Sequence, residues 1–282
     1  VRLSDKSPHF RRRVHRRRYF VTHRYCPVYV GGENRCPQNA QHPQPPPFPL
    51  ADEIGGGYHA ACRQRVAEYQ PPFEQVMSDA FPLKGSWNRD FFRRDAPLIL
   101  ELGCGKGEYT TGLAQLRPGC NYIGVDIKGA RIWRGARTAK ELGLANVGFL
   151  RTHVDHLLKV FGPGEVNGIW LTFSDPQLGK DRKKLTSPLF LERYRQVLAP
   201  GGVIHLKTDS PELYHYTLDR VAQYGLPLYE HSADVYGELV PRLAPADQAM
   251  LNIRTFYESM WLGEGKKIHY CRFGIHPLLG AG

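Results

Sequence analysis

Residues 172–188, TFSDPQLGKDRKKLTSP, place a carboxylate directly after a hydrophobic segment and then a group of cations with the single acid Asp181 among them. Gly168–Phe173 is expected to be a buried strand, and Asp175 follows it just before Pro176. The basic residues that come next are Lys180, Arg182, Lys183 and Lys184. A carboxylate at a strand end can hold a substrate by hydrogen bonds, and a neighbouring basic loop can bind phosphates. The alternative is a turn-initiating aspartate beside a solvated face.

A glycine-rich turn follows an earlier hydrophobic segment, in LELGCGKGEYT at residues 100–110. Gly103 and Gly105 leave the backbone open to a ligand where a helix is expected to begin. The dinucleotide fingerprint needs its third glycine at position 108, which is Glu108 here. This spacing argues against a nicotinamide-dependent oxidoreductase.

Two carboxylates flank this turn. Glu101 directly precedes it and would repel a pyrophosphate, so it suits a cationic ligand. Asp126 ends the next expected strand, where it can accept hydrogen bonds from both hydroxyls of a ribose. S-adenosylmethionine combines an amino group, a sulfonium and a ribose, so the two acids predict a site for it. His153, after the third expected strand, is placed near the adenine, although a surface or core histidine fits that position equally well.

The elements that must position these residues alternate between strands and helices. Strands are expected at Leu98–Leu102, Tyr122–Val125, Val147–Leu150, Gly168–Phe173 and Val203–Lys207. Helical patterns lie at 108–116, 129–142, 155–160, 187–198 and 211–223, and LAPGG at 198–202 is expected to form a turn. Such alternation predicts an α/β fold with a doubly wound, mainly parallel sheet. Residues 228–273 are expected to add closing strands with a helical or irregular insertion.

Composition separates the start of the chain from the rest. The 282 residues carry a net charge of +11, and an arginine-rich patch at 10–20 precedes a proline-rich stretch at 36–49. We expect residues 1–60 to be a disordered basic, proline-rich extension and residues 61–282 to form the folded domain. The six cysteines show no CxxC pair and no zinc spacing, so no metal site is predicted. No membrane span and no secretory signal are expected, which predicts a cytoplasmic protein.

Over about residues 70–273 the chain resembles the bacterial-type tRNA (guanine-N7)-methyltransferases. The segments that carry the resemblance are LKGSWNRDFF (83–92), LELGCGKGEYT (100–110), TFSDPQLGKDRKKLTSP (172–188), LAPGGVIHLKTD (198–209) and IRTFYESMWLGEGKKIHY (253–270). The resemblance implies a class I, Rossmann-like, S-adenosylmethionine-dependent methyltransferase domain. It also implies tRNA as the partner and the variable-loop guanine at tRNA position 46 as the target.

The resemblance further implies roles for single residues. The family's cofactor acids fall on Glu101 and Asp126, and its catalytic-loop aspartate falls on Asp175. Its loop lysine falls on Lys180. Its substrate-binding residues fall on Asp209 and on the T-x-x-E motif, Thr255 and Glu258, which a local helix cap would also explain.

The chain departs from the family pattern around the loop. Ser174 stands where a proline is common, and Gly179 and Asp181 stand at positions that are usually basic. The loop is also shorter than in many relatives. His153 replaces the usual acid near the adenine. These departures leave open the adenine contact and which loop cation meets RNA.

Guanine N7 carries an exposed lone pair, so no proton must leave before it attacks a methyl group. The product is a cation, and the expected task of Asp175, with Asp209 or Glu258, is to hold the N–H edge of guanine and offset that charge. A methyltransferase acting on another RNA or on a small molecule is one alternative. A non-catalytic RNA-binding protein with a degenerate cofactor pocket is another. The sequence is compatible with a monomer and with a homodimer.

Overall fold

The computed structural model describes residues 81–275. These residues all belong to one compact unit. The predicted extension, residues 1–60, lies outside the described residues. Among residues 81–275, no helix combines the length and the hydrophobicity that crossing a membrane requires.

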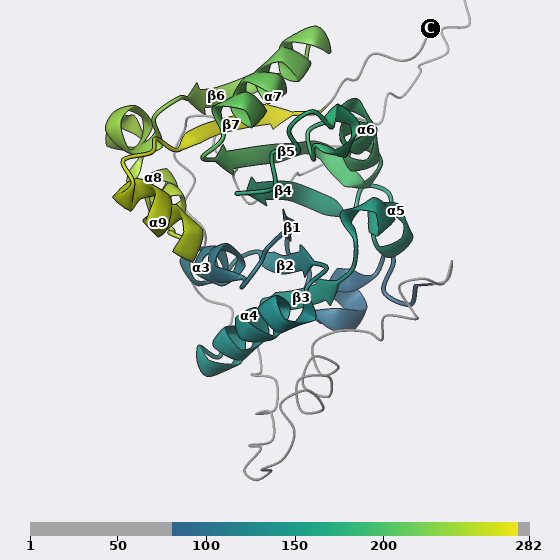
Figure 1. The fold of residues 1–282 in the computed structure, drawn as a ribbon. Coiled ribbons are helices and arrows are strands. Elements are labelled where there is room, and N and C mark those ends of the chain that lie inside the picture. Colours follow the sequence, from purple (N-terminus) through teal and green to yellow (C-terminus); the bar gives the residue numbers. More distant parts are fainter. Residues whose placement is uncertain (1–80, 276–282) are drawn as a thin grey trace, which may run out of the picture. The chain divides into compact units, whose positions relative to one another are not determined.

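Within the described residues, one seven-stranded sheet has the order β3-β2-β1-β4-β5-β7-β6 (Figure 1). Its strands are β1 Leu98–Leu102, β2 Asn121–Asp126, β3 Val147–Arg151, β4 Val166–Thr172, β5 Leu198–Thr208, β6 Leu228–Ser232 and β7 His269–Gly274. The first five strands are parallel, and β7 runs antiparallel to both β5 and β6. The strand order reverses between β1 and β4, which is where open sheets of this kind bind ligands.

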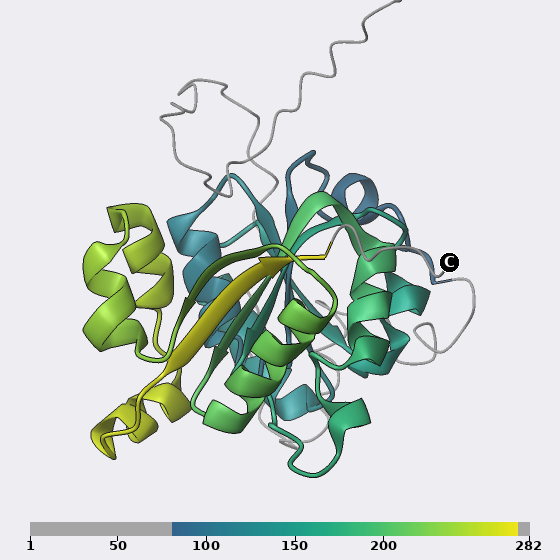
Figure 2. The same ribbon diagram turned by 90° about the horizontal axis from the view of Figure 1, so that it is seen from above.

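Helices cover both faces of the sheet (Figure 2). They are α3 Glu108–Leu116, α4 Gly129–Glu141, α5 Leu157–Val160, α6 Pro188–Val197, α7 Pro211–Gln223, α8 Pro245–Leu251 and α9 Phe256–Gly263. Short helical turns occur at Trp87–Phe91, Val154–His156, Asp181–Lys183, Val235–Leu239 and Val240–Arg242. The helices α3 and α4 pack together against β2 and β3, whereas α7 packs against β5 and β7. Apolar side chains between these layers form one buried core.

Local sequence signals explain where the helices begin. Ser210 caps α7 by accepting a hydrogen bond from Leu213 N at 3.2 Å, and Pro211 occupies the first helical position. Thr255 and Glu258 form a capping box at the start of α9. Each expected strand and helix has a counterpart in the structure, and the two closing strands are β6 and β7. Two bounds differ: Phe173 follows β4 instead of ending it, and the helix expected at 155–160 is a helical turn, Val154–His156, followed by α5.

One expected turn is wrong. The chain passes directly from α6 into β5 at Leu198, because Leu198 pairs with Val166 of β4. The LAPGG segment is therefore part of the strand. The pairing is irregular between Val166 and Gly168, and Gly201 has a φ of 79°. A short bulged segment of this kind cannot be told from a turn by its composition.

Candidate cofactor and substrate site

The glycine turn is fastened to the end of β2. Gly105 N donates to Asp126 Oδ2 at 2.9 Å, and Lys128 N donates to Asp126 Oδ1 at 2.8 Å. Gly103 N also donates to the carbonyl of Val125 at 2.7 Å. Because β1 and β2 are adjacent parallel strands, their carboxyl ends bring Glu101 and Asp126 to the same edge of the sheet.

The three glycines of the turn have different surroundings. A Cβ atom added to Gly103 or Gly105 would meet no atom within 4 Å, and both residues have positive φ angles. A Cβ atom on Gly107 would lie 2.5 Å from Phe149 Cε1. Gly107 therefore allows the start of α3 to pack closely against Phe149. Gly103 and Gly105 instead border open space that a ligand can enter. This arrangement fits the predicted cofactor position.

Glu101 is a buried acid with two hydroxyl partners. The hydroxyl of Thr110 on α3 donates to Glu101 Oε2, and the hydroxyl of Thr172 at the end of β4 donates to Glu101 Oε1. Burial raises the pKa of Glu101 to about 7, and the two hydrogen bonds oppose that rise. A cation placed beside this carboxyl group would favour its ionised form. Glu101 is thus suited to neutralise the positive charge of a ligand.

The loop after β4 has a strained backbone. Phe173 and Gln177 have positive φ angles of 50° and 48°, which residues other than glycine adopt rarely. Asp175 lies between them and is exposed, and its Oδ1 accepts a hydrogen bond from Gln177 N at 2.9 Å. Asp175 therefore shapes the loop while its carboxylate faces solvent. Backbone strain of this kind is concentrated at functional sites.

The loop cations divide into two kinds. Lys180, Arg182 and Lys183 are exposed. Lys184 is buried, and its Nζ donates to Asp181 Oδ1 at 2.5 Å and to the carbonyl of Gln177 at 3.3 Å. The expectation that Lys184 meets phosphates is therefore wrong, because its charge is used inside the loop.

Two further predicted residues lie near the same edge. Asp209 directly follows β5 and is half-buried, and burial raises the pKa of its carboxyl group. His153 precedes the helical turn Val154–His156 and is exposed, with its ring centroid 5.9 Å from that of His156. The adenine contact of His153 stays a prediction.

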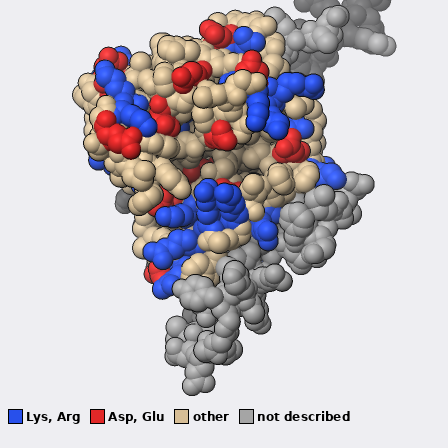
Figure 3. Space-filling view, viewed as in Figure 1, with Lys and Arg blue, Asp and Glu red and all other residues tan. Residues whose placement is uncertain are grey.

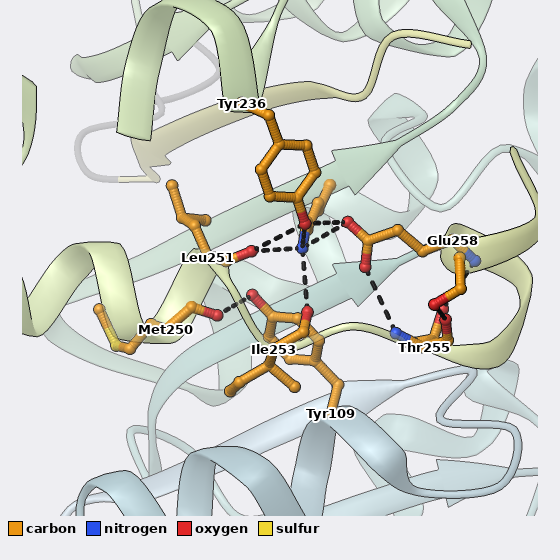
Figure 4. Close-up of polar contacts among 9 residues, drawn as sticks. Tyr109, Tyr236, Met250, Leu251, Ile253, Thr255 and Glu258 are labelled. Carbon is orange, nitrogen blue, oxygen red and sulfur yellow. Dashed lines mark hydrogen bonds and ion pairs between the residues drawn. The ribbon is translucent and has the colours of Figure 1, made fainter. Parts of the chain in front are cut away.

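The T-x-x-E motif contacts a buried lysine, Lys207, for which the sequence predicted no role. Figure 4 shows Glu258 and Tyr236 of this cluster pointing toward one another. Lys207 Nζ lies 2.8 Å from Glu258 Oε1, and it donates to the carbonyls of Leu251 at 2.7 Å and Ile253 at 3.1 Å. The hydroxyl of Tyr236 donates to the same Glu258 oxygen at 2.6 Å. Burial lowers the pKa of Lys207 to about 8, although Glu258 opposes that shift. A buried ion pair thus anchors the motif to β5.

The start of α9 also reaches the glycine turn. Phe256 N donates to Glu108 Oε2 at 3.1 Å, and the hydroxyl of Tyr109 donates to the carbonyl of Met250 at 2.7 Å. The Thr255 hydroxyl accepts a hydrogen bond from Glu258 N at 3.2 Å. The helix cap that was the alternative explanation of the T-x-x-E motif is therefore present. A contact between this motif and a base stays a prediction.

The structure thus gathers most predicted site residues at one edge of the sheet. In Figure 3 the surface is hollowed where Figure 1 shows β1 and β4, and Lys and Arg side chains gather on both sides of the hollow. Within residues 81–275, no group of three His, Cys, Asp or Glu side chains is arranged to hold a metal ion.

Comparisons with known proteins agree with this geometry. A family model described as "Putative methyltransferase" matches residues 95–271. The tRNA (guanine-N(7)-)-methyltransferase of Porphyromonas gingivalis is 49% identical over 209 residues, which cover 73% of this chain and 84% of that protein. The protein of the same name from Bacteroides fragilis is 46% identical over 214 residues, covering 76% of this chain and 81% of that protein.

A solved structure supports the fold. The 16S rRNA methyltransferase KamB superposes with a TM-score of 0.50 at 17% identity, covering 67% of this chain and 93% of that chain. This likeness shows the Rossmann-like fold of class I methyltransferases. The two relatives named above show that the chain belongs to the tRNA (guanine-N7)-methyltransferase family.

Proposed function

We propose that the chain transfers a methyl group from S-adenosylmethionine to N7 of a guanine in tRNA. The observation that carries the proposal is the meeting of two acids, an open glycine turn and the strained loop that carries Asp175 at the strand-order reversal. The curated relatives, whose names state this reaction, support it.

The donor side of the site is built from β1 and β2. S-adenosylmethionine supplies a methyl group activated by its sulfonium. Asp126, oriented by two backbone N–H groups, is suited to accept from ribose hydroxyls. Glu101 neutralises the positive charge of the donor. The open space beside the backbone of Gly103 and Gly105 lets the donor enter.

On the acceptor side, the reaction needs positioning rather than a base. Guanine N7 attacks with a lone pair that is already free, and the ring becomes cationic. Asp175 offers an exposed carboxylate to the N–H edge of guanine and offsets the developing charge. Asp209 is the second acid that we assign to the guanine. Its side chain is only half-buried, so a base can still reach it.

Glu258 has a different assignment in this proposal. One of its oxygens is taken by Lys207 and Tyr236, and the other accepts from Thr255 N at 3.4 Å. We assign it to holding the motif in place, while Thr255 keeps the substrate-binding role that the family motif implies. Lys180, Arg182 and Lys183 bind phosphates of the tRNA, which fixes its register.

The test uses purified protein, methyl-labelled S-adenosylmethionine and unmodified tRNA, followed by digestion to nucleosides. Label in 7-methylguanosine supports the proposal, and tRNA with the position-46 guanine replaced should then lose the label. Label in another nucleoside rejects the target base. No label, with donor binding intact, rejects tRNA as the substrate, and no donor binding supports the inactive-pocket alternative.

A further inference from the structure

Helix α9 exposes large apolar side chains beside the site. Phe256 is 52% exposed, and Tyr257 and Met260 are each 44% exposed. Together with the partly exposed Trp261, these residues are called the α9 aromatic face. Residues four positions apart lie next to each other on a helix, so Phe256 neighbours Met260 and Tyr257 neighbours Trp261. A surface of this kind on a folded protein marks an interaction site.

The rings of this face form a continuous row. Tyr257 and Trp261 have centroids 5.9 Å apart with planes inclined by 29°, and Phe256 meets Tyr257 at 5.6 Å. Trp261 in turn lies 5.3 Å from Phe173, the first strained residue of the loop that carries Asp175. At the other end, the backbone N–H of Phe256 donates to Glu108 Oε2, next to the glycine turn. The row therefore extends from the glycine turn to the loop that carries Asp175.

Cations lie over the rings at both ends of the row. Lys106 Nζ is 4.5 Å from the ring centroid of Phe256, and Lys266 Nζ is 5.7 Å from that of Trp261. Lys266 also pairs with Glu264 at 3.1 Å. Exposed aromatic rings interleaved with cations are the chemistry with which proteins bind unpaired nucleotides, because rings stack on bases and cations attract phosphates.

We infer that the α9 aromatic face stacks an unpaired base of the tRNA next to the guanine that is methylated. The inference rests on the proposed function. Its occupant is a nucleobase because the face combines exposed, neighbouring flat rings with cations that attract phosphates. Tyr257 is the central ring of the row and determines how the target region is held.

The experiment compares Tyr257→Ala with Tyr257→Phe in the full chain, using unmodified tRNA. Loss of one stacked ring should weaken tRNA binding about tenfold in Tyr257→Ala, and Tyr257→Phe should bind as wild type. Affinity for S-adenosylmethionine should stay unchanged in both. The dependence of tRNA binding on salt should also keep its slope, because no phosphate contact is removed.

Tyr229→Ala is the matched control, because Tyr229 on β6 is also 44% exposed. It should bind tRNA as wild type. Tyr257→Ala protein that binds tRNA as tightly as wild type would overturn the inference. A loss of affinity for S-adenosylmethionine as large as the loss for tRNA would also overturn it, because it would report local unfolding. A change of oligomeric state in Tyr257→Ala would assign the face to a second copy of the chain instead. If the wild-type protein methylates no tRNA, the proposed function itself is rejected. If the wild-type protein methylates tRNA and only the Tyr257→Ala prediction fails, this inference alone is rejected.

Discussion

Lys207 Nζ lies 2.8 Å from Glu258 Oε1, and neither side chain is exposed to solvent. The two residues come from the end of β5 and from α9, so their ion pair joins the sheet to the late sequence motif. The same ammonium group donates to the carbonyls of Leu251 and Ile253. The segment that leads into α9 is therefore held by one buried cation.

This pair predicts a large loss of stability when one partner is removed. Lys207→Met leaves the Glu258 carboxylate buried without its counter-charge, which should lower the free energy of unfolding by about 3–5 kcal/mol. Two backbone carbonyls also lose their donor. Chemical denaturation followed by circular dichroism measures the effect.

The double variant Lys207→Met/Glu258→Leu separates the charge from the packing. It should recover the part of the loss that comes from the unpaired charge, whereas the carbonyls of Leu251 and Ile253 still lack their donor. Lys180→Met is the control at an exposed lysine and should change stability by less than about 0.5 kcal/mol. A single Lys207→Met protein as stable as wild type would contradict the assignment.

Asp175 allows charge and loop shape to be tested apart. Asp175→Asn keeps an oxygen that can accept from Gln177 N, so the turn persists, but it removes the negative charge. If the charge stabilises the cation that develops in the transition state, the rate constant of methyl transfer should fall about a hundredfold in both Asp175→Asn and Asp175→Ala. Single-turnover methylation of tRNA, with donor and tRNA held at saturation, measures this.

The comparison of the two variants gives the control. Full turnover by Asp175→Asn together with a slow Asp175→Ala would assign Asp175 to the turn alone. Full turnover by both would remove Asp175 from the mechanism. Unchanged affinity for S-adenosylmethionine in each variant is required before either result is read.

The exposed loop cations predict a salt effect. Lys180→Ala and Arg182→Ala should each weaken tRNA binding and lower the slope of log K against log salt by about 0.7–1. The matched control is Lys140→Ala, an exposed lysine in the last turn of α4. Since α4 begins where β2 ends, its last turn lies toward the opposite edge of the sheet, and the slope should not change. An unchanged slope for both loop variants would place the RNA backbone elsewhere.

The parts of the site that depend on one strand and the next turn were predictable from the sequence. Glu101 and Asp126 end adjacent parallel strands, so hydrophobic patterning alone places their carboxyl groups at one edge. The helix expected at 108–116 is α3, because its apolar spacing and the preceding glycine agree.

The parts that depend on contacts between distant segments were not predictable. Thr172 reaches Glu101 only because β4 pairs with β1, with Trp170 opposite Glu101. Lys184 looks like a surface residue in the sequence, but the ring of Tyr216 on α7 lies 4.8 Å from its Nζ and Asp181 takes its charge. Lys207 stands in a strand pattern that fits any buried residue, and its partner Glu258 belongs to another element.

The raised pKa of Glu101 predicts that donor binding depends on pH. A cationic donor prefers the ionised carboxylate, so its affinity should fall as the pH drops below about 7, approaching about tenfold per pH unit. Glu101→Gln should bind S-adenosylmethionine more weakly at pH 8 and should lack this dependence between pH 5.5 and 7. Titration calorimetry at several pH values measures both.

Stability of the free protein should show the opposite preference. The pKa of Glu101 is higher in the folded chain than in the unfolded chain, so the folded state holds this proton more tightly. Its contribution is fully present at pH values below about 4.5 and is lost as the pH rises through about 7. Glu101→Gln carries no such loss, so at pH 8 it should be more stable than wild type by about 1–3 kcal/mol. A variant that binds the donor less well but unfolds later would show that Glu101 is kept for its charge at a cost in stability. A variant that is destabilised at pH 8 would show instead that the bonds from Thr110 and Thr172 need a carboxylate for the fold itself.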